Sequence, residues 1–314
     1  KIISTGLIKS GEQTCTVKFL GGAFKGQEAD GFNMLSGSLQ TDKIFQVGDK
    51  VLVVISHNGG EILSVNLIDH YRLNKEWILA GCFVLLLILF AGKTGIRAVL
   101  SFVITVLMIW KVMVPAYLNG MQPVLVGLGI VLGLTVIIIS LVYGFDRRSL
   151  SAVCGSFLGI ITTCILGIIF TDAFKIHGAI MSNSESLLYS GYEHLNLTQI
   201  FMASIFIGSS GAVMDLAVDI TSAVNEVVEK KPDIGWREAV RSGMAVGRAA
   251  MGTMTTTLLL AYSGGCVALL MVFMAQGTPL DNILNYKYVS SEILDTIVGS
   301  FGLVTVAPFT ALTS

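Results

Sequence analysis

The chain has 314 residues, of which 53% are hydrophobic and only 13% are Asp, Glu, Lys or Arg. A water-soluble domain of this length needs more charge to cover its surface, so the composition excludes an ordinary soluble protein. The formal net charge of −1 argues against a broad electrostatic attraction to nucleic acid. The five cysteines include no CxxC pair, so they predict neither a disulfide framework nor a zinc site.

Residues 1–70 predict a small β-rich domain. Short runs of strand-forming residues alternate with glycine-containing turns, and Asn58-Gly59-Gly60 between two β-branched runs is typical of a tight hairpin. Five short strands in so few residues favour a small barrel of the OB or SH3-like kind. We expect these strands at Ile2–Lys9, Thr14–Leu20, Gln27–Phe32, Lys50–Ile55 and Glu61–Ile68.

Residues 71–314 predict a transmembrane helical bundle, because their apolar runs reach the length of about 20 residues that crosses a bilayer. Between the fifth and sixth runs, residues 233–247 predict a helix in the cytoplasmic interface, with Trp236, Val240 and Met244 on an apolar stripe. We expect about seven spans, at Trp77–Gly92, Ala98–Tyr117, Pro123–Tyr143, Leu150–Thr171, Thr198–Ser222, Ala249–Gln276 and Glu292–Leu312.

The basic residues predict the orientation of the bundle. They gather after the first, third and fifth spans, and the alternate loops hold few beyond Lys175 and Lys287. Loops rich in Lys and Arg face the cytoplasm. The β domain and the loops at 175–196 and 277–291 are therefore expected outside. The cytoplasmic basic residues are Lys93, Arg97, Arg147, Arg148, Lys230, Lys231, Arg237, Arg241 and Arg248.

The fifth span carries two carboxylates, Asp215 and Asp219, which lie one turn apart on the same helix face. An intramembrane carboxylate disfavours insertion by about 2.5–3.5 kcal/mol, so it usually has a partner or a task. We interpret the pair as a proton- or cation-coupling site. Small residues that let a second helix approach closely occur on the fifth and sixth spans at Gly208, Gly211, Gly247 and Gly252.

The sixth span offers partners for these carboxylates. Arg248 at its cytoplasmic end is a candidate counter-charge, and Thr253, Thr256 and Thr257 are candidates for a polar path. In the alternative interpretation, Arg248 anchors the helix at the cytoplasmic face. The threonine hydroxyls would then hydrogen-bond to their own helix.

Several runs of residues carry a resemblance to a known family. They are Gly211–Asp215, Gly247–Thr255 and Val306–Ala311 in the helical region, and Gly22–Gly26 and Val47–Val51 in the β domain. In this combination the chain resembles the YibE/F family of bacterial membrane proteins over nearly its whole length. The resemblance implies a multi-pass inner-membrane protein, typically with one more span before Lys1, and it implies no particular activity.

A second, partial resemblance covers residues 195–275. An Asp-bearing span, an interfacial helix and a Thr-rich span are similar to one half of an RND-type permease, as in SecD/SecF and the sterol-sensing transporters. In those proteins the Asp-bearing span relays protons or cations. Because such permeases combine two halves, the resemblance implies a homodimer or a paralogous subunit. The large extracytoplasmic insertion after the first span of those permeases is missing from this chain.

Together these features favour a transporter-like half-permease in which Asp215 titrates, Asp219 is its electrostatic neighbour and Arg248 is the counter-charge. The alternative is a non-transporting envelope assembly or scaffold module whose β domain binds a partner. We expect no enzyme, because the spans hold no Ser/His pair and no HExxH motif. We also expect no cofactor, no metal and no nucleic acid.

Overall fold

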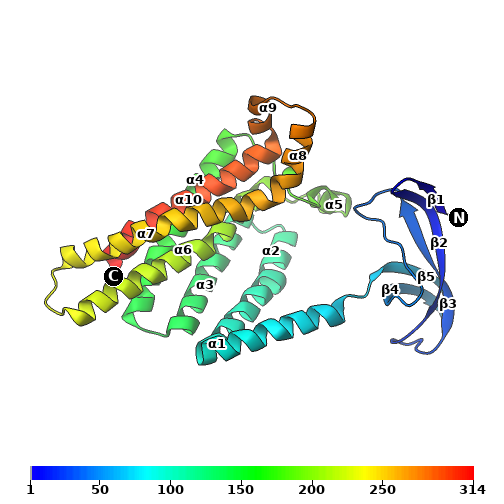
Figure 1. Ribbon diagram of the computed structural model, residues 1–314, viewed down its shortest axis with the longest axis horizontal. Helices are drawn as coiled ribbons and strands as arrows, with labels where there is room; N and C mark the ends of the chain where they lie inside the picture. Colours follow the sequence, from blue (N-terminus) through cyan, green and yellow to red (C-terminus); the bar gives the residue numbers. More distant parts are fainter. Residues whose placement is uncertain (1) are drawn as a thin grey trace. The chain divides into compact units, whose positions relative to one another are not determined.

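The computed structural model describes residues 2–314 and divides between Leu87 and Ile88 into two compact units (Figure 1). The first unit holds a five-stranded sheet, and the second holds most of the helices. The division falls within helix α1, Leu73–Met108. The last strand ends at His70, where we expected the β domain to end.

The sheet of the first unit has the strand order β1-β2-β3-β5-β4. Neighbouring strands are antiparallel except β3 and β5, which are parallel. The prediction of a small five-stranded N-terminal sheet is confirmed. The strands are β1 (Ile2–Thr5), β2 (Ile8–Lys18), β3 (Glu28–Ser36), β4 (Val51–Asn58) and β5 (Glu61–His70).

The first hairpin differs from the prediction of one strand over Ile2–Lys9, which is wrong. The chain reverses at Gly6 and Leu7, so that Thr5 pairs with Ile8. Gly6 has a φ of 64°, and glycine at the first position of a two-residue loop is typical of a type II′ turn. All residues of β1 are exposed, so no alternation of apolar and polar residues marks the boundary.

The hairpin between β4 and β5 confirms the tight turn that was predicted from Asn58-Gly59-Gly60. Asn58 pairs with Glu61 across the turn. Gly59 and Gly60 have φ values of 58° and 99°, and two successive positive φ values are what a type I′ turn requires. Here the local turn chemistry alone specifies the structure.

A buried polar network ties the long loop before β4 to the sheet. Asn33 is 3% exposed, and its Nδ2 donates to Gln13 Oε1 at 3.1 Å and to the Lys43 carbonyl at 2.6 Å. Gln13 in turn donates through Nε2 to the Phe45 carbonyl at 2.7 Å and accepts from the Phe45 N–H at 3.1 Å. Each partner is hydrogen-bonded, as buried polar groups require. Beside this network, an apolar core forms around Phe19, Phe24 and Val65.

Six helical segments of the described chain are long and apolar enough to cross a membrane. This supports the prediction of a multi-pass membrane protein. They are Leu73–Leu118, which comprises α1, η1 (Ile109–Met113) and α2 (Val114–Leu118); α3 (Pro123–Tyr143); α4 (Arg147–Ala173); α6 (Leu197–Lys230); Trp236–Ala275, which comprises α7 (Trp236–Ser263), η3 (Gly264–Cys266) and α8 (Val267–Ala275); and α10 (Lys287–Thr313). The connecting segments contain η2 (Gly178–Ile180), α5 (Ser184–Tyr189) and α9 (Leu280–Leu284).

The count of six differs from the expected seven because Leu73–Leu118 forms one segment of 46 residues. We had predicted two spans there, separated after Gly92. The backbone of Gly92 is non-helical, with φ 56° and ψ −127°. The direction of the helix therefore changes at the residue that ends the first predicted span.

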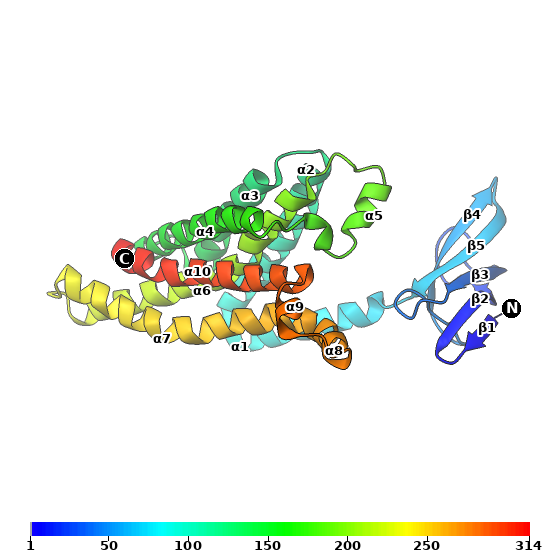
Figure 2. The same ribbon diagram turned by 90° about the horizontal axis from the view of Figure 1, so that it is seen from above.

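Helix α6 forms the centre of the helical unit. In its most apolar stretch 61% of the residues are buried, against 6% in the segments Leu73–Leu118 and Trp236–Ala275. It packs against α3, α4, α7 and α10, and Figures 1 and 2 show it among these helices. Small residues permit this close packing: a Cβ on Gly159 would lie 2.9 Å from Val213 Cγ1, and one on Gly299 would lie 3.0 Å from Ser209 Cβ.

The stretch predicted as an interfacial helix is the first part of α7, which begins at Trp236 and continues without a break to Ser263. Two residues of its apolar stripe pack inside the helical unit, whereas the third, Trp236, is 67% exposed. Val240 and Met244 contact the core cluster, and a Cβ on Gly243 would lie 2.6 Å from Val224 Cγ2 of α6. Part of the amphipathic pattern therefore reflects helix–helix packing within the chain, and the position of this stretch in the cytoplasmic interface stays a prediction.

Candidate functional site

The two carboxylates predicted from the sequence lie on α6, four residues apart. Asp215 and Asp219 are both exposed at the surface of the helical unit, between buried neighbours such as Leu216 and Ala217. The two carboxyl groups interact electrostatically with each other and with Tyr143 at the end of α3. In the sequence analysis Tyr143 only marks the end of a span, so the structure adds it to the neighbourhood of the pair.

Arg248 is exposed on α7, and within residues 2–314 no ion pair joins it to Asp215 or Asp219. Its role as their counter-charge therefore stays a prediction. At the same end of the bundle, Arg148 at the start of α4 forms an ion pair with Glu229 near the end of α6. This contact brings together two of the basic loops that were predicted to share the cytoplasmic side.

The threonines of the predicted polar path bond to their own helix. Thr253 donates to the Ala250 carbonyl at 3.0 Å, Thr256 to Gly252 at 3.1 Å, and Thr257 to Thr253 at 3.0 Å. This is the alternative that the sequence left open. Each hydroxyl oxygen keeps acceptor capacity, so these residues can accept a hydrogen bond but their protons are already engaged.

The four glycines divide into two kinds. A Cβ on Gly208 would lie 2.5 Å from the Tyr262 hydroxyl oxygen, and one on Gly247 would lie 3.0 Å from Ile220 Cδ1, so both lie at close helix contacts. A Cβ on Gly211 or Gly252 would meet no atom within 4 Å. These two glycines, like Asp215, lie on the open surface of the unit.

A second group of polar side chains lies where α6, α7 and α10 meet. Asp295 on α10 has a fully buried Oδ1, and Tyr262 on α7 has a fully buried hydroxyl; neither atom has a hydrogen-bond partner in the described chain. The two groups interact electrostatically. Gly208 on α6 provides the space for the Tyr262 hydroxyl.

Glu292 extends this group by one turn of α10. It interacts electrostatically with Asp295 and with the Cys266 thiol. Sequence reasoning used Glu292 only to mark the start of the last span and missed Asp295. The i, i+3 spacing of two carboxylates within an apolar run was the available signal, because it places them on one helix face just as for Asp215 and Asp219.

Two family models match the chain and together span both of its parts. The model of the YibE/F-like protein matches residues 79–314, and the model of the YibE/F family N-terminal domain matches residues 8–71. Searches of curated proteins and of solved structures gave no significant match.

Proposed function

The chain belongs to the YibE/F family, and we propose that it is a transporter-like half-permease of the bacterial inner membrane, coupled to protons or cations through carboxylates within its helices. The six apolar helices support the membrane assignment. The observation that carries the coupling proposal is the buried, unpartnered Oδ1 of Asp295 beside the unpartnered hydroxyl of Tyr262.

A carboxylate oxygen buried without a donor is strongly disfavoured, because it has lost its hydration and gained no hydrogen bond. A bound proton or a small cation removes this penalty. Ionisable groups within spans therefore mark proton and ion pathways. The Oδ1 atom of Asp295 is a buried oxygen of this kind. Glu292, one turn away on α10, is a second carboxylate to which the proton or cation can be transferred.

The carboxylates on α6 and α10 divide the bundle into two levels. Gly208 lies level with the Tyr262 hydroxyl, beside Asp295. Asp215 is seven residues farther along α6, which corresponds to about 10 Å at 1.5 Å per residue. We infer a relay in which Glu292 and Asp295 serve the outer half, and Asp215 and Asp219 serve the cytoplasmic half. This arrangement is in keeping with the partial resemblance to RND-type permeases.

The exposed position of Asp215 and Asp219 favours a dimer. Carboxylates within spans almost always face a bundle interior or a water-filled cavity rather than lipid. In a single chain this face is open, and Gly211 and Gly252 leave space on it. We infer that a second copy or a paralogous subunit covers it, which would complete the permease.

The topology follows from the length of the first helical segment. A straight helix of 46 residues would be about 69 Å long, more than twice the hydrocarbon thickness of about 30 Å. We infer that the chain crosses twice, reversing at Gly92, which gives seven spans. With the basic loops in the cytoplasm, the β unit is outside. Its strand order, with parallel β3 and β5, favours an open barrel of the OB type.

Carbodiimide labelling tests the coupling proposal directly. Dicyclohexylcarbodiimide reacts with protonated carboxyl groups in apolar surroundings, so mass spectrometry should find it on Asp295. Asp295→Asn should remove the label, and the matched control Asp281→Asn, at an exposed position on α9, should retain it.

Transport is tested in proteoliposomes that contain the dye pyranine and carry a sodium or potassium gradient. The protein should accelerate movement of protons under one of these gradients, and Asp295→Asn should abolish the effect while Asp281→Asn does not. Rates equal to those of protein-free vesicles under both gradients, or an Asp295→Asn variant as active as the native chain, would refute the proposal.

A further inference from the structure

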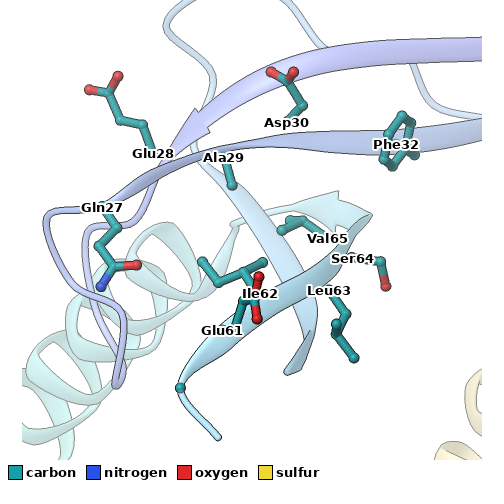
Figure 3. Close-up of a pocket in the computed structure, with 11 residues that line it drawn as sticks. Gln27, Glu28, Ala29, Asp30, Phe32, Glu61, Ile62, Leu63, Ser64 and Val65 are labelled. Atoms are coloured by element: carbon teal, nitrogen blue, oxygen red, sulfur yellow. The ribbon is translucent and has the colours of Figure 1, made fainter. Parts of the chain in front are cut away.

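The β unit contains a groove between strands β3 and β5. It has a volume of about 510 Å³ and is lined by residues of the segments 27–32 and 60–65. This volume lies within the range of about 300–1,000 Å³ that is usual for ligand sites. In Figure 3, Ala29 and Ile62 extend from the two strands toward the space between them.

The groove exists because the sheet is nearly divided at this point. β2 and β3 form a ladder of nine residue pairs, whereas β3 and β5 share only the pair Phe32 and Asn66. Residues 28–31 of β3 and 61–65 of β5 therefore have no ladder partner on the facing side, within the part of the chain that is described. Strand edges of this kind are available to pair with another chain.

A β-bulge in the ladder of β4 and β5 lies in the same region. His57 pairs with Ile62 and Ser56 with Ser64, so Leu63 is an extra residue on β5. Bulges interrupt pairing and redirect side chains, and they are frequent next to binding sites. Leu63 is 66% exposed and belongs to the lining of the groove.

The groove is acidic. Glu28, Asp30 and Glu61 belong to its lining, and Lys18 is the basic partner of Glu28 at 3.6 Å. Asp30 accepts a hydrogen bond from the Thr16 hydroxyl at 2.8 Å, which leaves its charge in place. An occupant of complementary chemistry would carry basic side chains as well as apolar ones.

We propose that this groove binds an extended, basic segment of a partner polypeptide, which adds as a strand to the open edges of β3 and β5. Main-chain hydrogen bonds would supply affinity, and alternate side chains would supply specificity. Apolar side chains would contact Ile62 on the core side, and basic side chains would lie on the exposed side with Leu63 and the carboxylates. The proposal does not depend on transport, because the groove shares no residue with the helical unit.

The test uses the full chain in detergent and three fluorescein-labelled, end-capped peptides: Lys-Val repeated three times, Glu-Val repeated three times, and Lys-Pro repeated three times. Fluorescence anisotropy should show saturable binding of the Lys-Val peptide alone. The Glu-Val peptide has the wrong charge, and the Lys-Pro peptide keeps the charge but has no N–H at alternate positions. Binding of the Lys-Val peptide should weaken as salt is added.

Two variants place the binding in the groove. Glu61→Gln should weaken binding of the Lys-Val peptide about two- to five-fold, as expected for loss of one exposed ion pair. Leu63→Arg should weaken it further, and Leu39→Arg, at a position 68% exposed outside the groove, should have no effect. No saturable binding, equal binding of the Glu-Val peptide, or equal effects of the two arginine variants would overturn the proposal.

Discussion

Replacing Gly92 with alanine tests the break in the first long helical segment. The space around a Cβ at this position is open, since no atom would lie within 4 Å. The effect must therefore come from the backbone, whose φ of 56° is a conformation that side-chain-bearing residues rarely adopt. Gly81 on the same helix is a matched control, because it is helical and a Cβ there also meets no atom within 4 Å.

The two substitutions should change stability in opposite directions. Alanine at a strained position such as Gly92 costs about 1–3 kcal/mol. Alanine at Gly81 should stabilise the chain by about 0.5–1 kcal/mol, because glycine in a helix interior is entropically unfavourable. The difference is about 1.5–4 kcal/mol. At about 2–4 °C per kcal/mol, the melting temperatures of the two variants should differ by about 3–16 °C.

Thermal unfolding in detergent can be followed with a thiol-reactive dye, because Cys164 is 5% exposed and reacts only when the helices separate. The other four cysteines, Cys15, Cys82, Cys154 and Cys266, are not buried and are first replaced by serine. If Gly92→Ala melts no lower than Gly81→Ala, the segment continues as a helix through residue 92. The inference of two crossings would then be wrong.

Three further predictions concern the β unit and the topology. Asn33→Ala should destabilise the chain by about 1–3 kcal/mol in urea unfolding, because the Lys43 carbonyl loses the hydrogen bond from Asn33. Asn66→Ala, at an exposed position of the same sheet, should change stability by less than about 0.5 kcal/mol, and equal effects would contradict the network. The backbone N–H of Ser36 and neighbouring donors hold the pKa of Asp42 below its usual value. The ionised Asp42 should therefore stabilise the chain fully above the pKa that this group has in the unfolded chain, and this stabilisation should be lost as the pH falls through its folded pKa. Asp42→Asn should remove this acid dependence of stability, and an unchanged acid profile of the variant would disprove the prediction. In a cysteine-free background, a cysteine at Glu185 should react with an impermeant thiol reagent added outside and one at Asp233 should not, whereas the reverse result would invert the topology.

Features that depend on local chemistry or on composition can be predicted from the amino-acid sequence alone. Apolar runs of bilayer length identify a membrane protein whatever their packing, because lipid imposes the requirement on each helix separately. The hairpin at Asn58–Glu61 follows from the positive φ values that Gly59 and Gly60 can adopt. The first predicted span ends at Gly92, where the backbone is non-helical.

Which polar groups share a site depends on how the helices pack against one another. Asp295 and Tyr262 are 33 residues apart in sequence, and nothing local indicates that Gly208 leaves room for the Tyr262 hydroxyl beside Asp295. The apolar stripe near Val240 can be buried against a membrane surface or against a neighbouring helix, and both give the same periodicity. The sequence pattern could therefore not distinguish these two environments. The separation of β3 from β5 likewise depends on long-range pairing. All three features depend on contacts between segments that are far apart in the sequence. Such contacts form only when the whole chain packs, so no local sequence pattern predicts them.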